Sequence, residues 1–199
     1  MGTTSPVSRA VQPAVVWLTG LPSAGKSTIA ERLAADLRER GVPVEHLDGD
    51  AIRELFPTGF TRSERESHVR RFGYFASRLE HHGVVVVASF VSPYADSRGF
   101  VRRLCRNFVE VHVATPVEEC ERRDVKGLYA RARRGEITRF TGIDDPYEPP
   151  VNPEVTIDTR KVSVREASRR ILEKLEGGHV APAPRVPDTE TGWIPPCTE

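Results

Sequence analysis

Short apolar runs alternate with amphipathic stretches along most of this 199-residue sequence. The apolar runs predict strands at 15–18, 44–47, 84–87, 108–113 and 155–157. The amphipathic stretches predict helices, the clearest of them at 26–39, 65–81 and 163–175. The runs are too uniformly apolar for strands with one face in water, which indicates parallel strands covered on both faces. We therefore predict an α/β fold of three layers, a mostly parallel sheet flanked by helices.

A glycine-rich segment joins the first predicted strand to the first predicted helix and fits the pattern G-x-x-x-x-G-K-[ST]. Its glycines let successive backbone N–H groups face one anion, and the helix adds its positive N-terminal end. The lysine is expected to contact the β- and γ-phosphates, and the next serine to supply a hydroxyl to Mg²⁺. The pattern predicts a P-loop NTPase-type fold whose nucleotide contacts come from Gly20, Leu21, Pro22, Ser23, Ala24, Gly25, Lys26, Ser27 and Thr28.

Acidic residues follow the second predicted strand rather than the third. Asp48 and Asp50 come directly after 44–47, whereas the strand at 84–87 continues without an acid. Ligands bind beyond the carboxyl ends of parallel strands. A carboxylate there can orient an alcohol, accept its proton and hold hydrated Mg²⁺. The sequence also has no Asn-Lys-x-Asp element for guanine, so it favours a small-molecule kinase that uses ATP.

Composition narrows the range of partners. Lysine and arginine (29) nearly balance aspartate and glutamate (28), so there is no global basic field for nucleic acid or anionic lipid. The three cysteines have no disulfide or zinc spacing, and a reducing cytoplasm is the expected setting. The longest apolar run, 83–88, is too short to span a bilayer. We expect neither nucleic acid nor membrane as a partner.

Three regions follow one another along the chain. Residues 1–13 are expected to be a flexible leader, and 14–176 a P-loop kinase domain. From 177 to 199 the chain is rich in proline and glycine and has no periodicity, which predicts a loose tail. Docking of Trp193 and Ile194 onto the domain is the alternative for this tail. Within the domain, 115–118 and 163–166 have the form of capping boxes at helix starts.

Several segments between Trp17 and about Asp158 resemble the adenylyl-sulfate kinase family, which makes 3′-phosphoadenylyl sulfate in sulfate assimilation. They are GLPSAGKST, LDGDAIR, GFTRSER followed by VRR, VSPYADSR, EVHVATPVEECERRDVKGLYARARRGEI and FTGIDDPYEPP. The resemblance implies ATP-dependent phosphorylation of the 3′-hydroxyl of adenylyl sulfate. It also implies a homodimer and a helical lid over about 124–145 that closes over both nucleotides and excludes water. A basic surface helix is the alternative for the lid's cations, Lys126, Arg131, Arg133, Arg134 and Arg139.

The resemblance also implies roles for single residues. Asp50 would be the base that orients the acceptor hydroxyl near Mg²⁺, with Ser27 and Asp48 as further metal contacts. Arg53 and Arg65 would bind the phosphosulfate end of the substrate. Phe60 and Phe140 would hold the adenine between them, because stacking recognises a base without needing charge. The rest of the acceptor pocket would be Val91, Ser92, Lys126, Thr141 and His68.

Ser92 is often described in the family as a phosphoserine intermediate. Direct in-line transfer needs no covalent step, and a serine just past a strand end can simply donate a hydrogen bond to substrate. Two residues differ from the family's usual asparagines, namely Ala51 and His68. We expect a hydrogen bond to the acceptor to be lost or exchanged there, with His68 either replacing the amide or lying on the helix surface. Two alternatives stay open: a kinase of another small alcohol or nucleotide, and a non-catalytic nucleotide-binding module.

Overall fold

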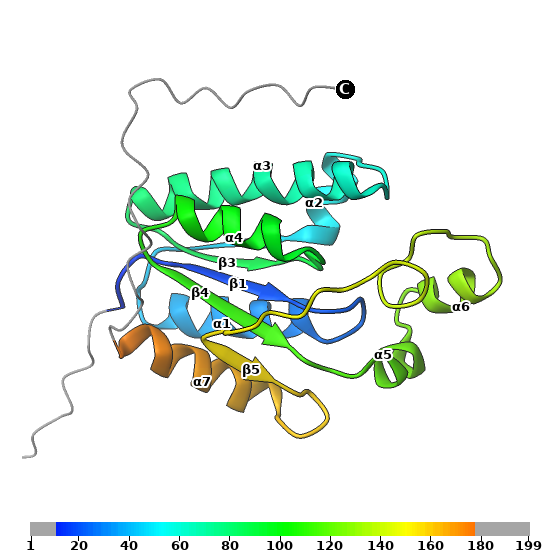
Figure 1. Ribbon diagram of the computed structural model, residues 1–199. Coiled ribbons are helices and arrows are strands. Elements are labelled where there is room, and N and C mark those ends of the chain that lie inside the picture. Colours follow the sequence, from blue (N-terminus) through cyan, green and yellow to red (C-terminus); the bar gives the residue numbers. More distant parts are fainter. Residues whose placement is uncertain (1–10, 178–199) are drawn as a thin grey trace, which may run out of the picture.

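The computed structural model describes residues 11–177, and Figure 1 shows their arrangement. Five strands of the described chain form one sheet in the order β2-β3-β1-β4-β5, and every neighbouring pair is parallel. Most of the predicted leader and tail, including Trp193 and Ile194, lies outside the described residues. The strands are β1 (Val15–Thr19), β2 (Val44–Asp48), β3 (Val85–Ser89), β4 (Phe108–Val113) and β5 (Val155–Ile157).

Helices cover both faces of the sheet, which confirms the predicted three layers (Figure 1). On one face lie α1 (Lys26–Glu39) and α7 (Val164–Glu176), and on the other lie α3 (Arg62–His81) and α4 (Ala95–Leu104). The central strand β1 is buried along its whole length because its side chains alternate between two cores. Val16 and Leu18 belong to the core beneath α1 and α7, and Val15 and Trp17 to the core beneath α3 and α4.

Three short helices lie near the carboxyl ends of the strands, α2 (Gly49–Leu55), α5 (Val117–Arg123) and α6 (Leu128–Arg133) (Figure 1). The loops around them therefore gather at the edge where parallel α/β sheets bind ligands. Among residues 11–177, no helix combines the length and the apolar character needed to cross a membrane.

The helix starts show which local predictions hold. The Ser163 hydroxyl accepts the backbone N–H of Glu166, which confirms one of the two hydrogen bonds of the capping box predicted for α7. The cap predicted at Thr115 is wrong, because α5 begins after Pro116 without a side-chain cap. The Thr115 hydroxyl instead donates to the carbonyl of Ala24, 3.0 Å away in the P-loop. The local pattern predicted that Thr115 would cap α5, but its hydroxyl bonds to Ala24, a residue distant in the sequence.

Candidate active site

The P-loop, residues 20–25, leads from β1 into the 14-residue helix α1. A Cβ atom on Gly20 would lie 2.5 Å from the carbonyl oxygen of Val113, so this position cannot hold a side chain. Gly25 is the N-cap of α1 and has φ of 103°, a conformation that side chains disfavour. The loop thus leads directly into the N-terminal end of α1, whose unpaired backbone amides favour an anion.

The side chain of Lys26 folds over this loop. Its Nζ donates to the carbonyl oxygens of Gly20 at 3.0 Å and Leu21 at 2.7 Å. Burial lowers the pKa of Lys26 to about 8, and the nearby charges of Asp50 and Asp48 only partly oppose that effect. The lysine that the motif singled out is therefore buried beside the loop with neutral partners for its ammonium group.

Asp48 joins the P-loop helix to the end of β2. Its Oδ2 accepts the hydroxyl of Ser27 at 2.6 Å and that of Ser89 at 2.8 Å. Its Oδ1 caps α2 by accepting the backbone N–H groups of Asp50 and Ala51. Burial would raise the pKa of Asp48, but these hydrogen bonds outweigh burial and the pKa lies below its ordinary value. One ionised carboxylate therefore connects α1, β2, β3 and α2.

Asp50 lies in the first turn of α2, and its carboxylate is paired with a residue of the predicted lid. The Nζ of Lys126 is 2.8 Å from its Oδ2, and both side chains are more than half exposed to solvent. The same carboxylate is close enough to Lys26 to affect that residue's pKa. The structure thus brings Asp50, Lys26 and Lys126 together from three separate segments of the chain.

Two arginines flank an exposed aromatic ring after α2. The Phe60 ring is 48% exposed, and the guanidinium carbons of Arg53 and Arg65 lie 5.1 Å and 5.6 Å from its centroid. Arg53 also donates to the carbonyl of Thr58 at 2.9 Å. An exposed ring beside two cations is suited to an anionic ligand that carries a flat base.

Arg65 is buried and its donors already contact protein groups. Nε donates to the carbonyl of Phe60 at 3.0 Å, and Nη1 donates to the Thr141 hydroxyl and lies 3.3 Å from Asp145 Oδ2. Nη2 donates to the carbonyl of Arg139. Arg65 therefore anchors residues 139–145 to the start of α3, and contact with a substrate would require some of these bonds to be exchanged.

Phe140 differs from Phe60, its predicted stacking partner, because it is only 5% exposed. Its ring meets the Tyr129 ring edge to face at 4.9 Å, and both belong to the core beneath α1. The Tyr129 hydroxyl in turn donates to the carbonyl of Pro22 in the P-loop. Phe140 is thus linked to the P-loop through Tyr129, and in this structure Phe60 offers the open ring face.

His68 is buried rather than on the helix surface, so that alternative is wrong. Its ring packs 4.9 Å from the Phe72 centroid and 6.0 Å from that of Phe90. Burial, with the charge of Arg53 nearby, lowers the pKa of His68 to about 4. The imidazole is therefore neutral at physiological pH. Ala51, the other departure from the family pattern, is exposed on α2.

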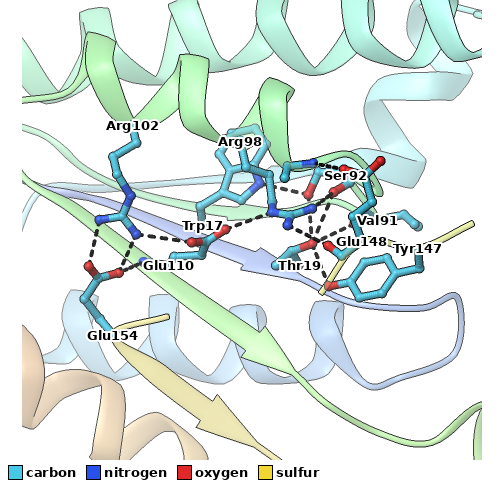
Figure 2. Close-up of polar contacts among 11 residues, drawn as sticks. Trp17, Thr19, Val91, Ser92, Arg98, Arg102, Glu110, Tyr147, Glu148 and Glu154 are labelled. Carbon is cyan, nitrogen blue, oxygen red and sulfur yellow. Dashed lines mark hydrogen bonds and ion pairs between the residues drawn. The ribbon is translucent and has the colours of Figure 1, made fainter. Parts of the chain in front are cut away.

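Ser92 lies just beyond β3 in the left-handed region, with φ of 39° (Figure 2). Its hydroxyl accepts the indole N–H of Trp17 at 3.0 Å and donates to Thr19 Oγ1 at 3.0 Å. Thr19 itself donates to the carbonyl of Val91 at 2.8 Å. Only 2% of Ser92 is exposed, so its hydroxyl is committed to the protein interior.

The sequence placed Trp17 only as a strand residue and assigned no role to Thr19 or Tyr147. The Tyr147 hydroxyl lies 3.1 Å from Thr19 Oγ1, which links the chain after the predicted lid to the end of β1 (Figure 2). A signal was available, because a buried indole N–H and a hydroxyl at the end of an apolar strand both require partners. The sequence alone did not say where those partners are.

The predicted lid cations pair mostly with acids close to them. Arg133 bonds to Glu121 at 2.8 Å, and Arg134 to Glu136 at 2.6 Å. Arg131 lies 3.4 Å from Glu136. These side chains are largely exposed, whereas Lys126 of the predicted lid pairs with Asp50 on α2. Within residues 11–177, no group of three or more His, Cys, Asp or Glu side chains is arranged to hold a metal ion.

A parallel sheet, a P-loop before its first helix and two carboxylates at the end of β2, the second strand in the sequence, define a P-loop kinase. The family model for adenylylsulphate kinase matches residues 12–158. The adenylyl-sulfate kinase of Gloeothece citriformis is 52% identical over 163 residues, which are 81% of this chain and 93% of that protein. The chain belongs to the adenylyl-sulfate kinase family.

Solved structures agree with this assignment. The APS kinase CysC of Mycobacterium tuberculosis, in complex with AMPPNP and APS, is 38% identical, with a TM-score of 0.79 over 84% of this chain and 99% of that one. The hexameric APS kinase of Thiobacillus denitrificans is 35% identical, with a TM-score of 0.65 over 85% of this chain and 30% of that one.

Proposed function

We propose that this protein transfers the γ-phosphate of ATP to the 3′-hydroxyl of adenylyl sulfate and so produces 3′-phosphoadenylyl sulfate. The observation that supports this most directly is the Asp48 junction. Asp48 bonds to Ser27 at the start of α1 and to the backbone of Asp50 in α2. It therefore fixes the distance between the phosphate-binding loop and Asp50. A base that must meet the outermost phosphate of a bound nucleotide needs such a fixed relation.

On the donor side, the amides of the P-loop and the N-terminal end of α1 would hold the polyphosphate. Lys26 would leave the carbonyls of Gly20 and Leu21 for the phosphates, because a charged acceptor is a stronger partner than a neutral one. The N-terminal turn of α1 would then direct the γ-phosphate toward α2.

The residues present fit a magnesium ion. Ser27 and Asp48 offer oxygen donors 2.6 Å apart at the head of α1, and Mg²⁺ favours one or two protein oxygens plus phosphates and waters. When bound, the ion would neutralise charge on the phosphates. Ser27 and Asp48 would hold it, with Asp50 close by on α2.

On the acceptor side, the adenine would stack on the exposed face of Phe60, and Arg53 would receive the phosphosulfate end. Arg65 and Phe140 would form the lid side of this pocket, where both already contact the protein. Its remaining wall would consist of Val91, Ser92, Thr141 and neutral His68.

In the transfer step, the 3′-oxygen of the acceptor forms a bond to the γ-phosphorus while the bond to the β–γ bridging oxygen breaks. Asp50 would orient the hydroxyl and accept its proton late in the step, and ADP leaves with the bridging oxygen. The ion pair between Asp50 and Lys126 would open to admit the hydroxyl. Lys126 and Lys26 would remain near to stabilise charge on the transferring group.

A coupled assay of ADP release tests the proposal. Adenylyl sulfate should stimulate release more than other small alcohols or nucleotides at equal concentration. Faster turnover of another acceptor would contradict the substrate assignment. Tight ATP binding with no acceptor-dependent release would indicate a non-catalytic module.

Replacing Asp50 by alanine tests the base. We expect Asp50→Ala to lower turnover by roughly 10²–10⁴-fold, as for loss of a positioned general base. The exposed side chain contributes little to packing, so the unfolding temperature should stay close to that of the wild type. Glu54→Ala, an exposed acid on the same helix, is the matched control and should keep full turnover. Normal turnover by Asp50→Ala would remove Asp50 from this role.

The proposal includes two broader expectations. A homodimer is expected, which light scattering during size-exclusion chromatography would measure against the monomer mass of 22.2 kDa. A cytoplasmic location is expected, consistent with the buried free thiols of Cys105 and Cys120.

A further inference from the structure

A cluster of four charged residues, two of them buried, lies between α4 and the sheet (Figure 2). We call Arg98, Arg102, Glu110 and Glu154 the Arg98 cluster. Arg98 is 3% exposed, and its Nε donates to Glu110 Oε1 at 2.8 Å. None of these residues has a part in the transfer step described above. A buried charge is costly unless every donor has a partner, so the remaining contacts of Arg98 are informative.

The two terminal nitrogens of Arg98 bond to backbone carbonyls on two separate segments. Nη1 donates to the carbonyl of Ser92 at 2.7 Å, just after β3. Nη2 donates to the carbonyl of Glu148 at 2.6 Å, on the chain that returns from the lid. A planar guanidinium can serve these three directions together, which a lysine ammonium on a flexible stem cannot reproduce. One side chain therefore fixes β4, the segment after β3 and the segment after the lid to one another.

The two segments that Arg98 contacts also bond to each other. The backbone N–H of Glu148 donates to the carbonyl of Pro93 at 2.8 Å, and the N–H of Ala95 donates to Glu148 Oε2 at 2.7 Å. The Tyr94 hydroxyl donates to Asp145 Oδ2 at 2.9 Å. Residues 91–95 and 145–148 thus form one hydrogen-bonded unit, with Arg98 on its buried side.

We infer that Arg98 is a positioning residue for the acceptor. This rests on the proposed function, in which Val91, Ser92 and Thr141 line the acceptor pocket. Arg98 touches none of the reacting atoms. It holds the carbonyl of Ser92, whose φ of 39° is an uncommon conformation for serine that needs support from its surroundings. Its loss should displace the pocket wall while leaving the P-loop in place, because the hydrogen bonds of the Arg98 guanidinium go to Ser92, Glu110 and Glu148 and none goes to residues 20–28.

Arg102 provides a matched control one turn further along α4. It bonds to Glu154 at 2.7 Å and 2.8 Å and to Glu110 at 3.2 Å. None of its side-chain contacts reaches 91–95 or 145–148. Arg102 therefore shares the charge, the helix and the partner Glu110 with Arg98, but not the contacts that would position the acceptor.

The test compares Arg98→Met with Arg102→Met in steady-state assays that vary ATP and adenylyl sulfate separately. For Arg98→Met we expect the KM for adenylyl sulfate to rise at least about tenfold and the KM for ATP to change by less than about twofold, since small displacements of positioning groups have large effects. For Arg102→Met we expect both KM values to stay near those of the wild type and the unfolding temperature to fall. Equal losses for both substrates, or the same pattern in both variants, would overturn the inference.

If Arg98→Met does not fold, Arg98→Lys provides a second test of the same inference. It keeps a cation opposite Glu110 but cannot reach the carbonyls of Ser92 and Glu148 at the same time. A folded Arg98→Lys protein with a raised KM for adenylyl sulfate alone supports the inference, and an unchanged KM overturns it. Absence of acceptor-dependent ADP release by the wild type would instead count against the proposed function, so the two failures are distinguishable.

Discussion

Lys26 has two alternative sets of partners, the carbonyls that it contacts in this structure and the phosphates of a nucleotide. Its pKa of about 8 reflects burial with neutral partners, so at pH 8 about half of the molecules carry a neutral Lys26. Bound phosphates favour the ammonium form and therefore raise this pKa. The side chain should take up protons as nucleotide binds.

This proton uptake gives the first prediction at the residue scale. Uptake on binding an ATP analogue should be marked at pH 8–8.5 and fade below about pH 7, where Lys26 is already protonated before binding. Calorimetry in buffers of different ionisation enthalpy measures it. In Lys26→Met the pH-dependent part of the proton uptake should disappear. Any uptake that remains in this variant measures the ionisation of the nucleotide itself, which can then be subtracted. Equal uptake by the two proteins would show that another group is responsible.

Ser92 gives the second prediction at this scale. Its hydroxyl is buried and already hydrogen-bonded to Trp17 and Thr19, so phosphorylation would break both bonds and bury a dianion. Incubation with ATP labelled at the γ-phosphate should therefore leave no label on the protein, and adding adenylyl sulfate should move label directly to the product. Acid-stable label on Ser92 that then passes to the acceptor would contradict direct transfer.

The site was predictable where its geometry is local to a motif. The pattern around Lys26 specifies a backbone conformation, and Asp48 and Asp50 follow from strand polarity. The contacts of Trp17 with Ser92 and of Arg65 with Thr141 were not predictable from local patterns, because they join residues 75 and 76 positions apart. The resemblance named Arg65 and Phe140 as pocket residues, but it could not show how completely the protein itself uses them.

At the scale of elements, α3 and α4 pack closely at a glycine. A Cβ atom on Gly73 would lie 2.2 Å from Cγ2 of Val101, a fully buried side chain of α4. The start of α3 was predicted at Arg65 but lies at Arg62, because Thr61 and Glu64 form a capping box. That signal was present in the sequence, whereas the close approach of the two helices had no local signature.

The glycine contact predicts a reversal of the usual effect of alanine in helices. Gly73→Ala should destabilise the protein by about 1–3 kcal/mol through overpacking, although alanine in a helix interior normally stabilises by up to about 1 kcal/mol. Chemical denaturation measures the change. Gly99→Ala on α4 is the control, since its nearest neighbour would be Arg103 Nη1 at 3.5 Å, and it should stabilise slightly.

A double-mutant cycle identifies the atom responsible. Adding Val101→Ala should relieve part of the loss in Gly73→Ala, so the two changes together should cost less than their sum. Strict additivity would mean that Val101 is not the contact that limits residue 73.

At the scale of the whole molecule, stability should decrease from the central strand to the proposed lid. All five residues of β1 are buried, whereas Tyr129 is the one residue of α6 that is buried. Amide hydrogen exchange should therefore be slowest in β1 and fast in 124–145. An ATP analogue and adenylyl sulfate together should slow exchange in 124–145 more than either alone, as expected for a lid that closes over both. Unchanged exchange there at saturation would argue for a surface helix instead.

The two carboxylate oxygens of Asp48 accept hydrogen bonds from four donors of the protein itself. In the proposed mechanism, Asp48 thereby holds both the site of the phosphoryl donor and the base Asp50. A change in the contacts to the acceptor can leave these hydrogen bonds intact. A descendant of this chain that came to use a different alcohol would be expected to keep aspartate at 48 and to vary at positions such as Ala51, Phe60 and His68. New substrates could then be acquired stepwise, because each substitution in the acceptor pocket would leave the γ-phosphate positioned for transfer.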